Sequence, residues 1–161
     1  MSNKDNFKLT KTGDIYINNR SLIDIVKEIE LAGIRADYES YENKEDEDLN
    51  ELLLVAGDYQ PLPLWMIKFS SRYFLDEAKD FTGKFMAKPE NIIRNKTTLL
   101  GCTCRIIECW YLLAKITLTE NTVTWSDFQN FHRDWWQYNL SFTFDRQQYE
   151  AGLIFDLNTI K

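Results

Sequence analysis

The residues best suited to metal or thiol chemistry are Cys102, Cys104, Cys109 and the only histidine, His132. Three thiolates and one imidazole would complete a tetrahedral zinc site, and cysteines two positions apart share one face of a strand. Structural zinc sites usually separate each ligand pair by two to four residues, whereas here C-x-C is followed by four residues and a lone cysteine. Free cysteine is also among the most buried residue types. We therefore interpret these thiols as core residues and keep a small zinc-binding or thiol-dependent protein as the alternative.

His132 is also the one imidazole that could act as a general base for a cysteine nucleophile. Nothing local resembles a nucleophile elbow or a cysteine-protease segment. The neighbours Arg133 and Asp134, within an aromatic run, are more typical of a packed or interface histidine. The six glycines are scattered, and neither G-x-G-x-x-G nor G-K-[ST] occurs. The sequence therefore predicts a protein that is not an enzyme, with no catalytic residues and no cofactor.

Aromatic side chains are concentrated between Trp125 and Tyr149. Most of them are expected in the core, because a small sheet must bury its aromatic face. The adjacent Trp135 and Trp136 cannot both point inward in an extended chain, so one of them is a candidate exposed anchor for a protein interface. Aromatic side chains interleaved with basic residues can also stack on the bases of single-stranded RNA. Only two basic residues, Arg133 and Arg146, lie among these aromatics, so RNA binding is disfavoured.

Negative charge is concentrated in residues 37–51, which we call the acidic segment. It carries eight carboxylates and one base, hence a charge of −7, while the whole chain carries −6 and the rest sums to +1. Such a run is usually a solvated loop. It would also repel phosphate backbones and attract a basic protein, so we expect a protein partner and no nucleic acid. The predicted partner-binding residues are Asp37, Glu39, Glu42, Glu45, Asp46, Glu47, Asp48, Trp135 and Trp136.

Length and composition predict one globular domain over residues 1–161. The chain is 44% hydrophobic and 27% charged, which is ordinary for a domain with a full core. Residues 1–11 are polar, and no apolar run approaches the roughly 18 residues of a membrane helix. Three clustered cysteines do not suggest a secreted disulfide framework. We expect a cytoplasmic protein without membrane contact, and the oligomeric state stays open.

The clearest predicted helix follows an N-terminal hairpin, which is expected within residues 8–18. Ser21 is a suitable N-cap, and apolar residues then recur at helical spacing until Gly33, which is expected to end the helix. One face is expected to pack on a sheet while charged residues face water. The apolar stripe comprises Leu22, Ile25, Val26 and Ile29, and the water-facing residues are Lys27, Glu28 and Glu30.

The C-terminal half predicts most of the sheet. Strands are expected over residues 97–104, 109–119 and 122–125, with a hairpin at Glu120-Asn121. Asp145 and Gln148 form a possible capping box for a final helix. The apolar run 52–56 is expected to be a buried strand, and Pro61 and Pro63 are expected to prevent regular strand pairing. Residues 64–74 are expected to be irregular, and residues 77–95 are expected to include one or two helical turns. Together these elements predict an α+β fold, mainly an antiparallel sheet with two principal packing helices.

The C-terminal half contains the motifs Cys102-Thr103-Cys104, Cys109-Trp110, Trp125-Ser126-Asp127-Phe128, His132-Arg133 and Phe142-Thr143-Phe144-Asp145-Arg146-Gln147-Gln148-Tyr149. The order of these motifs resembles a group of small uncharacterised bacterial proteins. The chain departs from that group at Arg105, Glu108 and Tyr111, where the group has glycines around the third cysteine and a proline after the tryptophan. Small acidic proteins of this kind look similar to immunity proteins encoded beside contact-dependent or polymorphic toxins. The resemblance implies an immunity protein that occludes the active site of a basic toxin domain, a nuclease being one candidate.

Overall fold

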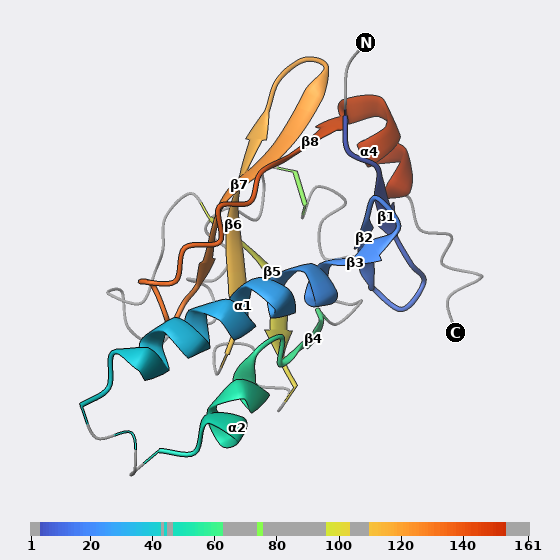
Figure 1. The fold of residues 1–161 in the computed structure, drawn as a ribbon. Coiled ribbons are helices and arrows are strands. Elements are labelled where there is room, and N and C mark those ends of the chain that lie inside the picture. Colours follow the sequence, from blue (N-terminus) through green and yellow to red (C-terminus); the bar gives the residue numbers. More distant parts are fainter. Residues whose placement is uncertain are drawn as a thin grey trace, which may run out of the picture.

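The computed structural model describes residues 4–42, 44, 47–62, 74–75, 96–103 and 110–153. These residues form the predicted α+β fold, in which helices pack against antiparallel sheets (Figure 1). The elements are β1 (Phe7–Leu9), β2 (Ile15–Ile17), β3 (Arg20–Ser21), α1 (Leu22–Glu39), α2 (Leu49–Leu52), the 3-10 helix η2 (Leu53–Val55), β4 (Tyr59–Pro61), β5 (Thr97–Cys102), β6 (Leu112–Leu118), β7 (Thr122–Asn130), β8 (Phe142–Asp145) and α4 (Arg146–Gly152).

The larger sheet has the order β4-β5-β6-β7-β8, and each neighbouring pair is antiparallel. The predicted hairpin between β6 and β7 is confirmed, with the Thr119 N–H donating to the Thr122 carbonyl at 2.9 Å. Residues 111–114 are all buried, so the expected alternation of β6 begins only after Ala114. The first part of β6 is therefore covered on both faces, as in the centre of a core.

The smaller sheet, β1-β2-β3, is held against α4 at the opposite end of the molecule from α2 (Figure 1). Asp145 caps α4 as predicted, because it accepts the Gln148 N–H at 3.0 Å. The Gln148 amide instead bonds the backbone of β1, donating to the Phe7 carbonyl at 2.6 Å and accepting the Phe7 N–H at 3.3 Å. Phe7 closes this end of the core through ring contacts with Trp125, Phe144 and Tyr149.

Helix α1 is longer than predicted, since it continues past Gly33 to Glu39. Gly33 lets the Trp136 ring pack closely against α1, because a Cβ at this position would lie 3.3 Å from Cδ1 of Trp136. The expectation that Glu30 faces water is wrong, as it is 1% exposed. The physical reason is helical spacing: Leu22, Val26 and Glu30 are four positions apart and share one face.

Residues 49–61 also differ from the prediction. The run 52–56 is not a buried strand, because it contains the end of α2 and the whole of η2 and leaves Leu54 75% exposed. Asp48 begins α2 by accepting the Asn50 N–H at 2.9 Å. Pro61 does pair, in β4, which is an edge strand where a missing N–H is tolerated.

Several predictions fall on residues outside the described ranges, namely those for Pro63, for 64–73 and for 77–95. Within the described part of the chain, no helix is both long enough and apolar enough to cross a membrane.

Candidate protein-binding surface

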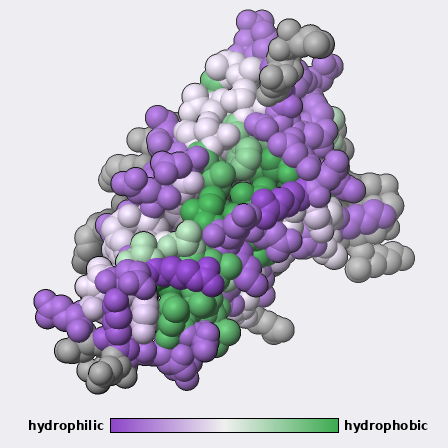
Figure 2. Space-filling model, viewed as in Figure 1, coloured by the Kyte–Doolittle hydropathy of each residue, from purple (hydrophilic) through white to green (hydrophobic). Residues whose placement is uncertain are grey.

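Three large hydrophobic side chains are exposed among the described residues, and all three adjoin the acidic segment. Tyr41 lies within the segment and is 38% exposed, and Leu54 follows its C-terminal end. Trp135 is 57% exposed and reaches the segment from a distant part of the chain, because its indole N–H donates to Asp37 at 3.1 Å. Over α2 and η2, Figure 2 shows a hydrophobic patch with hydrophilic residues around it. Apolar anchors and carboxylates therefore share one region of the molecule.

Asp37 positions both of the adjacent tryptophans. The Trp136 indole N–H donates to Asp37 Oδ2 at 2.8 Å, and that of Trp135 donates to Oδ1 at 3.1 Å. Trp136 is buried against α1 at Gly33, whereas Trp135 is the exposed member of the pair. The structure thus brings together three of the residues predicted to bind a partner, although Asp37 orients rings in addition to carrying charge.

Arg133 supports Trp135 from a second direction. Its guanidinium carbon lies 5.6 Å from the centre of the Trp135 ring and 5.1 Å from that of Trp110. The His132 ring stacks on Trp110 with a centroid distance of 6.4 Å and an interplanar angle of 12°. Trp135 is therefore held at its N–H by Asp37 and at its ring by a cation. A side chain fixed in this way loses little rotamer freedom when it binds a partner.

The acidic segment is a loop only in its middle. Asp37 and Glu39 belong to α1, and Asp48 is the N-cap of α2. Glu39 pairs with Lys44 at 3.1 Å on the surface. Glu45 and Asp46 lie outside the described residues. Within the acidic segment, the described carboxylates that are exposed are Glu39, Glu42, Glu47, Asp48 and Glu51.

A buried carboxylate, Glu30, ties together the elements beneath this surface. It accepts the Gly57 N–H at 2.8 Å, the Tyr138 hydroxyl at 2.5 Å and the Tyr59 hydroxyl. Tyr59 in turn accepts the Asn130 amide at 2.9 Å. Gly57 has φ of +65°, and a Cβ there would lie 2.5 Å from that of Lys27, so glycine is required.

Burial dominates the electrostatics of this network. It raises the pKa of Glu30, and the three hydrogen bonds that the carboxylate accepts oppose that shift. Burial, together with nearby Glu30, also raises the pKa values of Tyr59 and Tyr138, so both remain donors. The network joins α1 and β4 to the segment after β7 that carries the tryptophans. The sequence analysis did not predict that Glu30 is buried. The available signal was its spacing of four and eight positions from Val26 and Leu22, which places it on the same buried face of α1.

The cysteine and histidine residues do not form a metal site within the described part of the chain. Cys102 is buried in β5, whereas His132 is exposed beside Trp110. Cys104 and Cys109 lie outside the described residues. Among those that are described, no group of three or more histidine, cysteine, aspartate or glutamate side chains is placed to hold a metal ion.

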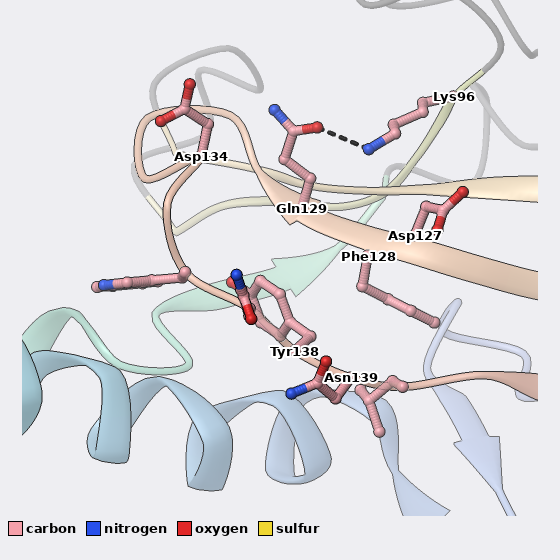
Figure 3. Close-up of a pocket in the computed structure, with 10 residues that line it drawn as sticks. Lys96, Asp127, Phe128, Gln129, Asp134, Tyr138 and Asn139 are labelled. Atoms are coloured by element: carbon pink, nitrogen blue, oxygen red, sulfur yellow. Dashed lines mark hydrogen bonds between the residues drawn. The ribbon is translucent and has the colours of Figure 1, made fainter.

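An open cavity of about 400 Å³ lies between the end of β7 and the residues that follow it (Figure 3). Lys96 borders it and donates to Oε1 of Gln129 at 2.7 Å. Burial lowers the pKa of Lys96, and the charge of Asp127 opposes that shift. The lining residues are Lys96, Asp127, Phe128, Gln129, Asp134, Trp136, Gln137, Tyr138, Asn139 and Leu140.

No protein-family model, curated protein or solved structure matches this chain. Inference about its function therefore rests on the contacts described above.

Proposed function

We propose that this chain is a cytoplasmic immunity protein that binds a basic bacterial toxin domain and occludes its active site, a nuclease being one candidate. One observation carries the proposal: Tyr41, Leu54 and Trp135, the large hydrophobic side chains exposed in the described part of the chain, all adjoin the acidic segment. Protein interfaces of high affinity combine a few apolar or aromatic anchors with a polar rim that excludes water.

Trp135 is the strongest candidate anchor. Tryptophan is enriched among residues that dominate binding energy, and Trp135 is already oriented by Asp37 and Arg133. Preorganisation favours affinity because less conformational entropy is lost on association. Leu54 and Tyr41 are exposed as well and would extend the contact.

The acidic segment supports a basic partner. A charge of −7 within residues 37–51 attracts a positive surface and raises the association rate, most strongly at low salt. A nuclease must hold phosphate groups, and its active-site cleft is therefore commonly positive. A carboxylate-rich surface bound there would exclude the nucleic-acid substrate.

The decisive experiment is co-expression with the C-terminal domain encoded by the neighbouring upstream gene. We expect the domain to stop growth alone, and this protein to restore growth and co-purify with it. Trp135→Ala should weaken the complex by about 30-fold or more, as for an interface hot spot. A toxin domain that kills regardless, or a complex unaffected by both Trp135→Ala and Leu54→Ala, would contradict the proposal.

Association kinetics test the role of charge separately. Glu47→Gln, Asp48→Asn and Glu51→Gln remove three negative charges, and asparagine retains the capping ability of residue 48. We expect slower association and a weaker dependence of the rate on salt. Glu120→Gln, in the exposed β6–β7 turn, is the matched control and should change neither quantity.

A further inference from the structure

Helix α2 and the 3-10 helix η2 form a short element that exposes apolar side chains. Two of the four residues of α2 and all three of η2 are leucine or valine, yet neither element contains a buried residue. Leu49, Leu52, Leu53 and Val55 are half-buried and pack against the core. Leu54 is 75% exposed, the largest value among the exposed large hydrophobic side chains of the described chain. Within this apolar run, Leu54 alone is left mostly in water.

This element is held in place at both ends. At the start of α2, Asp48 accepts the Asn50 N–H at 2.9 Å. After η2, the Gly57 N–H donates to the buried carboxylate of Glu30 at 2.8 Å. Leu54 therefore projects from a fixed support. A surface that is already formed in the free protein loses little conformational entropy when a partner binds.

The charge around Leu54 has one sign. Every charged side chain in the sequence from residue 45 to residue 62 is a carboxylate. Glu47, Asp48 and Glu51 are exposed. Glu51 precedes Leu54 by three positions along one helical stretch, so the two side chains lie on the same side of it. Figure 2 shows the apolar patch over α2 and η2 bordered by hydrophilic residues. Such a surface fits a partner that presents an apolar side chain bordered by positive charge.

A second copy of this chain does not meet that condition. Its own acidic segment carries −7 over residues 37–51, so two copies in contact at Leu54 would bring like charges together. Addition of a partner strand is not available at this element either, because residues 49–55 are helical and offer side chains instead of a strand edge. A helix that carries an apolar stripe between basic residues satisfies both requirements.

We propose that the surface of α2 and η2 receives a basic amphipathic helix of the partner. An apolar side chain of that helix packs on Leu54, and its lysine or arginine side chains lie beside Glu47 and Glu51. This inference rests on the proposed function, because it names the element with which a basic toxin domain binds. It places that element on α2 and η2, apart from the contact at Trp135.

The probe for this surface is a peptide of leucine and lysine in which leucines recur at helical spacing, titrated into the isotope-labelled protein and followed by NMR. We expect the methyl resonances of Leu53, Leu54 and Val55 to shift. Leu54→Ser should weaken binding about tenfold, as expected when an interface anchor is truncated. Leu54→Lys should weaken it further, because it adds a positive charge. Glu51→Gln should weaken binding at low salt and have less effect at high salt.

Two variants serve as matched controls. Trp135→Ala also removes an exposed apolar side chain, but outside this surface, and should leave the dissociation constant of the probe unchanged. Glu120→Gln removes an exposed carboxylate in the β6–β7 turn, at the other end of the molecule from α2 in Figure 1, and should likewise have no effect. Because Leu54 is mostly exposed, both Leu54 variants should unfold at the same temperature as the native sequence.

Three results would overturn the assignment. A peptide with glutamate in place of every lysine would bind as tightly as the probe, or both Leu54 variants would bind the probe as tightly as the native sequence does. The third is a dimer, seen by sedimentation, that Leu54→Ser dissociates, which would make a second copy the occupant.

These measurements are separate from toxin neutralisation. Neutralisation that depends on Trp135, while the probe fails to bind, rejects the helix-binding surface alone and leaves the proposed function in place. Binding of the probe at Leu54 without neutralisation of the toxin domain rejects the proposed function and leaves this surface as a site for basic amphipathic helices.

Discussion

The carboxylate of Asp37 accepts the indole N–H of Trp136 at 2.8 Å, joining the last turn of α1 to the chain beyond β7. The same carboxylate accepts the N–H of Trp135. One side chain thus fixes a buried ring and an exposed ring together. Asp37 differs in this respect from Glu42, Glu47 and Glu51, whose carboxylates are exposed and contribute charge.

Asp37→Ala should therefore destabilise the protein and release Trp135. We expect a loss of about 1–3 kcal/mol in the free energy of unfolding, because a hydrogen-bonded charge is removed. Urea denaturation measures this loss, and the 15N–1H resonances of both indoles should shift. Glu39→Gln is the control, since it breaks only a surface ion pair and should change stability by less than about 0.5 kcal/mol. Equal effects of the two substitutions would contradict the orienting role.

Truncation of the two tryptophans should destabilise the protein to different extents. Trp136 is 7% exposed, so Trp136→Ala leaves a cavity beside α1 and should cost about 3–5 kcal/mol of stability. Trp135→Ala removes an exposed ring and should cost no more than about 1 kcal/mol. Thermal or urea unfolding distinguishes them. If Trp135→Ala were the more damaging change, its loss of partner binding could not be assigned to the interface.

Glu30 predicts a specific pH dependence. Burial raises its pKa above the ordinary value of 4.5, so the native protein binds this proton more tightly than the unfolded chain does. The corresponding stabilisation is complete below the unfolded-state pKa and is lost as pH rises through the native-state pKa. Glu30→Gln abolishes this titration. The free energy of unfolding of the native sequence minus that of Glu30→Gln should fall with rising pH, measured by urea denaturation from about pH 4 to about pH 8. A difference that is constant over this range would show that Glu30 does not titrate as inferred.

Gln148 should control the docking of the N-terminal sheet. Gln148→Ala removes both hydrogen bonds to the Phe7 backbone, and we expect a loss of about 1–2 kcal/mol together with faster hydrogen exchange at the Phe7 amide. Gln147→Ala is the neighbouring control, because Gln147 is exposed. Unchanged exchange at Phe7 in Gln148→Ala would mean that packing of the Phe7 ring alone holds the sheet.

The elements that sequence reasoning predicted well are those governed by local rules. The β6–β7 hairpin follows from alternation around a short polar turn, and the start of α4 follows from Asp145 as a cap. Gly33 misled the prediction of where α1 ends because its small size serves Trp136, which is remote in sequence. The strand expected at 52–56 is helical in the structure. The prediction failed because the periodicity of a short apolar run cannot distinguish a buried strand from a helical segment.

The sequence indicates which residue types make up the candidate surface, but not how they are arranged. Charge concentration pointed to the acidic segment, and adjacency of Trp135 and Trp136 implied that one ring is exposed. Their contact with Asp37 depends on how α1 crosses the chain after β7, which no local pattern encodes. The Glu30 network is likewise assembled from four separate parts of the chain. Long-range side-chain bonds of this kind are visible only after folding.

The bonding of Gln148 to Phe7 has a consequence for synthesis in the cell. Phe7 leaves the ribosome 141 residues before Gln148, and its ring partners Phe144 and Tyr149 lie close to Gln148 in the sequence. The aromatic core therefore cannot close on a nascent chain, and this end of the molecule must fold after those residues leave the exit tunnel. Partly made copies therefore lack the aromatic core at this end of the molecule.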